Sequence, residues 1–288
     1  MIVSSPASSA NLGSGFDCLA LAVDLPFALS DEPPPSGEGW LAAEPTHPGT
    51  VAFRAAGGDP ATELHWRSPI PPGRGLGFSG ASRVAGAFLA GLCDGLEPLD
   101  ARDGAFRVAA ELEGHADNAA ASAHGGFVVS AGEHVGRLVV PPGLVVLVWS
   151  PSVTTSTDAS RRALPDVVPL SDASHSIAGA ALWVAGLATC DLSLLRRACE
   201  DRLHQPVRLG SQPGSTEALE VLLGNDSVLA AWLSGSGPTV AALLDVGADG
   251  ATLCAELPST GRCRTLDVAT LGVHQHDPTG HDPTGPES

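Results

Sequence analysis

The sequence predicts two globular domains, each of which combines β-strands with α-helices. Across residues 1–141, apolar strand-like stretches alternate with glycine-rich turns, and the segment ASRVAGAFLAGLCDGL carries Val84, Phe88 and Leu92 at helical spacing. The pattern changes at Pro141 and Pro142, which precede the β-type run LVVLVW. We therefore place a domain boundary between residues 141 and 142.

The second predicted domain covers residues 142–272. SIAGAALWVAGLA and DLSLLRRACEDRLHQ have the character of helices, and LAAWLSGSGPTVAALLDV reads as two strands joined by a glycine turn. The last stretch, residues 273–288, contains the repeat HDPTG twice and has few apolar side chains. Such a segment cannot bury enough apolar surface to fold, so we expect a disordered tail.

Composition limits the classes of partner. The chain of 288 residues is 43% hydrophobic and 16% charged, which is typical of a globular protein. Its net charge of -17 argues against nucleic acids and anionic membranes as partners, because their phosphates would be repelled. We see neither an apolar run long enough for a membrane helix nor a secretory signal, and expect a cytoplasmic protein. In that compartment the six cysteines, none in a CxxC pair, are expected to be buried apolar residues or free thiols.

The central motif is a glycine-rich loop that leads into a helix. Its glycines can adopt positive φ, and the helix N-terminus presents N–H groups and a positive dipole end to an anion. It lacks the lysine of a Walker A loop, and alone it would also fit a tightly packed turn. The predicted phosphate cradle consists of Pro72, Gly73, Arg74, Gly75, Leu76, Gly77, Phe78, Ser79, Gly80, Ala81 and Ser82.

Three further motifs give this loop a context. ANLGSGFD lies at residues 10–17, EGHADN at 113–118 and SGSGPT at 234–239. This set, in this order, resembles the GHMP kinases, and SSANLGSGFDCLALAVDLP, GRGLGFSGAS, SPSVTTSTDASRRALP and EDRLHQPVR resemble segments of the homoserine kinases among them. The resemblance spans about residues 3–245.

The resemblance implies an α+β fold with two domains and an active site between them. The N-terminal domain would be similar to ribosomal S5 domain 2, and the C-terminal domain would be ferredoxin-like. The implied reaction is transfer of the ATP γ-phosphoryl group, with Mg²⁺, to the side-chain hydroxyl of L-homoserine, a step of threonine biosynthesis. A homodimer is also implied.

A zwitterionic amino acid needs an anion for its ammonium group and cations for its carboxylate. Asp17 suits the ammonium, and Arg161 and Arg208 suit the carboxylate because guanidinium binds it in a fork. The resemblance carries the same roles onto these residues and adds Asn11 and Thr157 to the substrate site.

The EGHADN motif supplies the remaining candidates. Glu113 is the preferred Mg²⁺ ligand, with Ser79 as a second oxygen donor and Glu111 as the alternative to Glu113. His115 and Asn118 are expected beside the substrate. The predicted catalytic residues are His115, Asp117 and Asn118. For Asp117 we prefer a structural or electrostatic role over that of a base.

The phosphate loop departs from the family at Phe78, where a serine is usual. Two alternatives therefore stay open at this point. The chain could be another GHMP kinase acting on mevalonate, shikimate or pantoate, or a degenerate nucleotide-binding protein without catalysis. Because the main-chain N–H groups of the loop do not depend on the side chain at 78, we expect an active enzyme.

Overall fold

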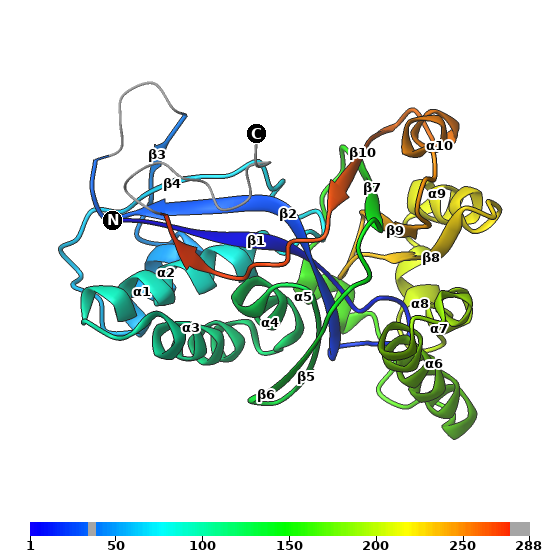
Figure 1. The fold of residues 1–288 in the computed structure, drawn as a ribbon, viewed down its shortest axis with the longest axis horizontal. Coiled ribbons are helices and arrows are strands. Elements are labelled where there is room, and N and C mark those ends of the chain that lie inside the picture. The colour runs from blue at the N-terminus through cyan, green and yellow to red at the C-terminus, as the bar shows by residue number, and fades with distance from the viewer. Residues whose placement is uncertain (34–38, 277–288) are drawn as a thin grey trace.

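The computed structural model describes residues 1–33 and 39–276 and contains two antiparallel sheets (Figure 1). In these ranges no helix has both the length and the apolar character needed to cross a membrane. The second sheet lies beside the end of the first, with helices α1–α4 beneath the first sheet and helices α6–α10 on the outer side of the second.

The N-terminal sheet runs in the order β11-β1-β2-β4-β3, and β5 pairs with both β2 and β6. Eight of the nine residues of β1 and ten of the twelve residues of β2 are buried, with Asp24 and Pro26 of β2 exposed, so the middle of the sheet is buried on both faces. The strands are β1 (Ile2–Ala10), β2 (Leu19–Ser30), β3 (Leu41–Ala42), β4 (His65–Arg67), β5 (Phe127–Ala131), β6 (His134–Leu138) and β11 (His274–Gln275). The helices are α1 (Pro48–Ala55), α2 (Phe78–Cys93), α3 (Pro98–Glu113) and α4 (Asp117–His124).

The C-terminal sheet has the strand order β10-β7-β9-β8. With its crossover helices this is a β-α-β-β-α-β arrangement, so the expected two-domain α+β fold with a ferredoxin-like second domain is confirmed. Its strands are β7 (Val145–Pro151), β8 (Val228–Leu233), β9 (Val240–Leu244) and β10 (Gly261–Asp267). The helices are α5 (Thr157–Arg162), α6 (Leu170–Thr189), the 3₁₀ turn η1 (Leu192–Leu194), α7 (Leu195–Ala198), α8 (Gln205–Leu209), α9 (Pro213–Leu223) and α10 (Gly250–Glu256).

One hydrophobic core runs through both domains, and a second lies within the C-terminal domain. Trp183 of α6 packs against Phe127 of β5 and against Trp232 of β8, with ring centroids 5.9 and 5.7 Å apart. The indole N–H of Trp183 donates to the main-chain oxygen of Leu12, and that of Trp232 donates to Ser9 Oγ, each over 2.9 Å. These contacts fix the end of β1 and the loop that follows it against the second domain.

The chain returns to the first domain after β10. Ala269 donates a main-chain hydrogen bond to Ala22, and β11 pairs with β1 through Ser4 and His274. The boundary predicted at residue 272 is therefore wrong, because the second domain ends at about Asp267. The predicted tail is also wrong at residues 273–276, which are ordered; residues 277–288 lie outside the described ranges.

One expectation about the cysteines is also wrong. Cys254 of α10 and Cys263 of β10 form a disulfide, with their Cα atoms 5.3 Å apart. The other four cysteines, at 18, 93, 190 and 199, have free thiols. The pair is separated by nine residues in sequence, and only the antiparallel return of the chain brings it together.

Candidate active site

The three glycine motifs meet at the carboxyl end of β1. Ser234 Oγ lies 2.5 Å from the main-chain oxygen of Gly75 and 2.7 Å from Ser9 Oγ. The main-chain N–H of Gly235 donates to Ala10, over 3.0 Å. A Cβ atom at Gly75 would lie 2.3 Å from the oxygen of Ser234, so glycine is required for the phosphate loop and the SGSGPT loop to touch.

These loops line a cavity of about 160 Å³. Seventeen of the predicted site residues line it, namely Asn11, Asp17, Gly73, Arg74, Gly75, Leu76, Gly77, Phe78, Ser79, Gly80, Glu113, His115, Asp117, Asn118, Thr157, Arg161 and Arg208. Three predicted phosphate-loop residues do not: Pro72 is replaced in the lining by Pro71, and Ala81 and Ser82 are fully buried in α2. The hydroxyl of Ser82 donates to main-chain oxygens at 78 and 79, so it is not a phosphate ligand here.

The phosphate loop ends in the N-terminus of α2. Gly77 is the N-cap residue in the left-handed conformation, at φ 67°, and no side chain caps the helix. The first N–H groups of the helix therefore have no side-chain partner at this end, beside the cavity. This is the arrangement that binds phosphate at helix N-termini.

Phe78 belongs to an aromatic cluster behind the loop. Its ring meets those of Phe27, His47 and Trp66 edge-on, at centroid distances of 5.7, 6.0 and 5.6 Å. Burial lowers the pKa of His47 to about 4, so this cluster is uncharged at neutral pH. Phe78 is therefore a packing residue that also borders the cavity.

Charged groups from both domains gather at one end of the cavity. Arg161 Nη1 and Nη2 donate to the two carboxylate oxygens of Asp17 over 2.7 and 2.8 Å. The guanidinium groups of Arg161 and Arg208 lie 5.5 and 5.4 Å from the ring centre of Phe16. The hydrogen bonds to Asp17 raise the pKa of Arg161. One carboxylate and two guanidinium groups thus share this end of the cavity.

Arg208 is 4% exposed and is held by His204 and by Gly235 of the SGSGPT motif. Its Nη1 lies 3.1 Å from His204 Nδ1 and donates to the main-chain oxygen of Gly235 over 3.0 Å. His204 Nε2 lies 2.8 Å from the main-chain oxygen of Gly13, which fixes the proton on Nε2 and leaves Nδ1 to accept. The Nε of Arg208 is buried and has no acceptor among residues 1–33 and 39–276.

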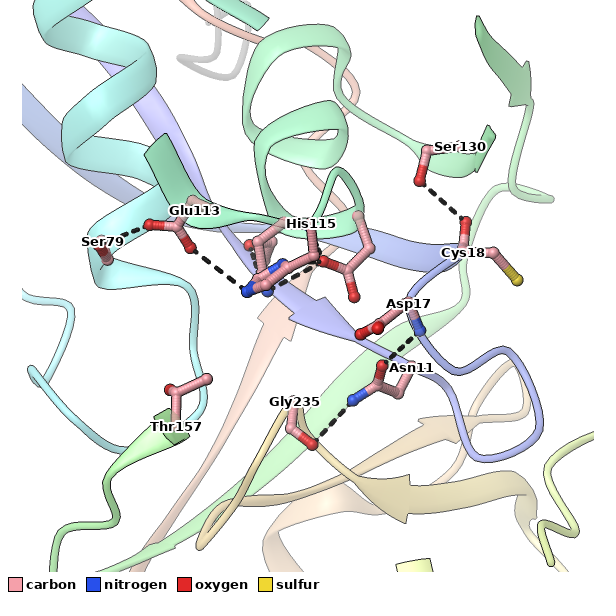
Figure 2. A network of polar contacts seen from close by, with 12 residues as sticks. Asn11, Asp17, Cys18, Ser79, Glu113, His115, Ser130, Thr157 and Gly235 are labelled. Atoms are coloured by element: carbon pink, nitrogen blue, oxygen red, sulfur yellow. Dashed lines mark hydrogen bonds and ion pairs between the residues drawn. The ribbon is translucent and has the colours of Figure 1, made fainter. Parts of the chain in front are cut away.

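Asn11 lies beside Asp17 at this end, and Thr157 also lines the cavity but stands apart from Asn11 in the view of Figure 2. The Oδ1 of Asn11 accepts from the main-chain N–H of Asp17, and its Nδ2 donates to the oxygen of Gly235, at 3.0 and 2.9 Å. Asn11 therefore joins the first loop to the third. Thr157 begins α5 and its Oγ1 lies 3.4 Å from Ser236 Oγ.

At the other end of the cavity, Ser79 faces Glu113. Ser79 Oγ donates to Glu113 Oε1 over 2.6 Å, across the start of α2 and the end of α3 (Figure 2). Arg83 Nη1 donates to Ser79 Oγ over 2.6 Å and forms an ion pair with Glu113 Oε1. Glu111, the alternative metal ligand, is exposed and does not line the cavity.

His115 links the two carboxylates of the EGHADN motif. Its Nδ1 lies 2.8 Å from Asp117 Oδ1, and its Nε2 lies 3.8 Å from Glu113 Oε2. Burial acts to lower the pKa of His115, but the hydrogen bond and charge of Asp117 outweigh burial and raise it. Asp117 Oδ1 also accepts from the main-chain N–H of Asn118 over 2.7 Å, at the first turn of α4. The Asn118 Oδ1 accepts from Ser8 Oγ over 2.8 Å.

Comparisons with known proteins show the family of the chain. Residues 49–126 match the family model described as the GHMP kinases N terminal domain, and residues 184–263 match GHMP kinases C terminal. The homoserine kinase of Thermus thermophilus is 42% identical over 254 residues, which cover 84% of this chain and 86% of that protein. The homoserine kinase of Moorella thermoacetica is 40% identical over 263 residues, with 84% and 86% covered.

The chain belongs to the homoserine kinase family of GHMP kinases.

Solved structures extend the family likeness to three dimensions. A crystal structure of homoserine kinase from Cytophaga hutchinsonii matches with a TM-score of 0.77 at 26% identity, covering 95% of this chain and 96% of that one. The mevalonate kinase of Methanococcus jannaschii matches with a TM-score of 0.65 at 13% identity, covering 93% and 98%. The second match shows a shared GHMP kinase fold and nothing more about the substrate.

Sequence reasoning missed Arg83, His204 and Gly13 within this homoserine kinase family site. His204 had a signal, because it lies in the family-like segment EDRLHQPVR. Arg83 had none, since a single arginine on a helix is usually a solvated surface residue.

Proposed function

We propose that the chain transfers the γ-phosphoryl group of ATP to the side-chain hydroxyl of L-homoserine, giving O-phospho-L-homoserine for threonine biosynthesis. The homodimer and the cytoplasmic location stay predictions from the sequence. The observation that carries the proposal is the charge layout of one cavity. Asp17, Arg161 and Arg208 lie at one end, and the glycine loop with the N-terminus of α2 lies at the other.

The first end of the cavity suits a zwitterionic amino acid. The ammonium group of the substrate would bind Asp17, and its carboxylate would bind the guanidinium groups of Arg161 and Arg208, which line the cavity. Both arginines stay charged at any physiological pH. Mevalonate, shikimate and pantoate each carry a carboxylate but no ammonium group, so they would leave Asp17 without a cationic partner from the substrate, which favours homoserine.

The second end suits the phosphates of ATP. Main-chain N–H groups at the start of α2 would bind them, and Arg74, which lines the cavity, would add a positive charge. The hydroxyl of Ser79 and the carboxylate of Glu113 are hard oxygen donors that border the same space, so they fit Mg²⁺. Bound there, Mg²⁺ would neutralise developing charge on the transferred group.

The EGHADN residues would orient the acceptor. Asp117 is 2% exposed and its Oδ1 is shared between His115 and the Asn118 main chain, which favours a positioning role over that of a free base. His115 would be held beside the transferred group by Asp117, since its Nδ1 lies 2.8 Å from Asp117 Oδ1 and its Nε2 lies 3.8 Å from Glu113 Oε2. Phosphoryl transfer depends mainly on such positioning and charge stabilisation.

The test compares phosphate acceptors, including analogues of L-homoserine from which one charged group has been removed. L-Homoserine, 4-hydroxybutanoate (no ammonium) and 3-aminopropan-1-ol (no carboxylate) are compared with mevalonate, shikimate and pantoate, each with ATP and Mg²⁺. We expect ATP consumption with L-homoserine, and loss of kcat/KM by at least about tenfold with each truncated analogue, because one charge-assisted contact is lost. A preference for another alcohol, or ATP binding without turnover on any acceptor, would reject the proposal.

A further inference from the structure

Arg83 joins the two oxygen groups that we assign to Mg²⁺. It lies one helical turn after Ser79 in α2, which brings its side chain back over the start of the helix. Its Nη1 contacts both Ser79 Oγ and Glu113 Oε1, and Ser79 Oγ itself donates to the same Oε1. Three groups from two helices therefore meet at one point.

The Arg83 guanidinium approaches Glu113 from outside the cavity. Ser79 and Glu113 line the cavity, and Arg83 does not. Glu113 Oε2 is directed toward His115, at 3.8 Å from its Nε2, so this oxygen faces away from the contact with Arg83. A cation bound in the cavity could then use Oε2 and the Ser79 oxygen while Arg83 stays bonded to Oε1.

The ion pair is sheltered from solvent. The side chains of Arg83 and Glu113 are 22% and 8% exposed. An arginine keeps its charge in such a place, and screening by salt is weaker than at the surface. Glu113 is therefore partly neutralised before any metal arrives.

We propose that Arg83 is a positioning residue of the metal site, which holds Ser79 and Glu113 in place and weakens their affinity for a free divalent cation. This inference rests on the proposed assignment of Mg²⁺ to Ser79 and Glu113. A permanent positive charge beside the carboxylate opposes a second cation, so the pair alone binds metal poorly. The cation is then bound well only together with the phosphates of the nucleotide, which supply the missing negative charge.

The test measures metal binding without nucleotide or homoserine, using Mn²⁺ and its electron paramagnetic resonance signal. Wild type is compared with Arg83→Met, which removes the charge and keeps the length, with Arg83→Lys, which keeps the charge, and with Glu113→Gln. We expect Arg83→Met to bind Mn²⁺ on the order of three- to tenfold more tightly, and Arg83→Lys to stay near wild type. In turnover, Arg83→Met should reach half its maximal rate at lower Mg²⁺ and have a lower kcat, because Ser79 loses a partner.

Two results separate the inference from the assignment beneath it. If Glu113→Gln abolishes Mn²⁺ binding and Arg83→Met binds no more tightly than wild type, Arg83 is only a structural link between α2 and α3. If Glu113→Gln binds Mn²⁺ as wild type does, the metal is not at Glu113, and both the assignment and the inference are rejected. Circular dichroism checks that each variant is folded, and Arg83→Gln replaces Arg83→Met if the latter is not.

Discussion

Arg161 holds the carboxylate of Asp17 in a two-point ion pair across 144 residues of sequence. The pair joins the loop after β1 to helix α5, and its side chains are 31% and 41% exposed beside the cavity. An amino acid carries one charge of each sign. When it binds, its ammonium group can replace Arg161 as the partner of Asp17, and its carboxylate can replace Asp17 as the partner of Arg161. Under the proposed function, the pair would keep both groups in place before the substrate binds.

Arg161→Ala should raise the KM for L-homoserine and leave the Kd for ATP nearly unchanged. Loss of a charge-assisted contact costs about 1.5–3 kcal/mol, equivalent to roughly ten- to hundredfold in KM. Because the pair is partly exposed, its loss should lower the free energy of unfolding by no more than about 1 kcal/mol. The matched control is Arg162→Ala, the next residue in α5, which does not line the cavity. Equal KM values for both variants would remove Arg161 from the substrate site.

Phe78 and Ser79 are neighbours with opposite expected phenotypes. Phe78→Ser should lower the free energy of unfolding by about 2–3 kcal/mol, because the aromatic cluster with Trp66 loses a ring, and kcat should change little. Ser79→Ala should lower kcat on the order of ten- to hundredfold, with a small effect on unfolding. For both variants, kcat is measured at saturating ATP and Mg²⁺, and the free energy of unfolding is measured by urea denaturation. A large gain in kcat from Phe78→Ser would mean that the phenylalanine marks a degenerate site.

The motif residues could be predicted because their chemistry is local. The glycine pattern before Phe78 requires a tight loop and a helix start, and the turn at Gly114 separates α3 from α4 as expected. The return of β11 to β1 could not be predicted, because two-residue strands carry no periodicity. Likewise, the partners of Arg83 depend on how α2 packs against α3, which sequence spacing alone does not define.

The buried Asp201 should make stability depend on pH in the acid range. Burial acts to raise its pKa, but the attraction of His204 in its protonated form and the hydrogen bonds from the main-chain N–H groups of residues 203–205 outweigh burial and lower it below 3.8. Its contribution is therefore complete above pH 3.8 and is lost as the pH falls through the lower folded-state value. Asp201→Asn should cost about 1.5–3 kcal/mol of unfolding free energy at pH 7, and this difference should shrink below pH 3.8. A difference that stays constant down to pH 2.5 would contradict the linkage.

Two truncations should differ at the end of the chain. Removing residues 277–288 should leave Tm and activity unchanged, because that segment has almost no apolar side chains. Removing residues 273–288 should lower Tm by several degrees, since Val273 is buried and β11 pairs with β1. Thermal unfolding of both proteins beside the full chain makes the comparison, and equal Tm values for the two truncations would show that β11 contributes nothing to stability.

The most direct test of the central claim is identification of the product by phosphorus NMR. The full chain is incubated with ATP, Mg²⁺ and L-homoserine, and parallel samples contain 3-aminopropan-1-ol or no acceptor. We predict that a phosphomonoester signal, coupled to a CH₂ group, grows in the L-homoserine sample as the ATP γ-phosphate signal falls, and that the parallel samples change little. If ATP is hydrolysed only to inorganic phosphate, or is bound and left intact in the presence of L-homoserine, the account of this cavity as a homoserine phosphorylation site is contradicted.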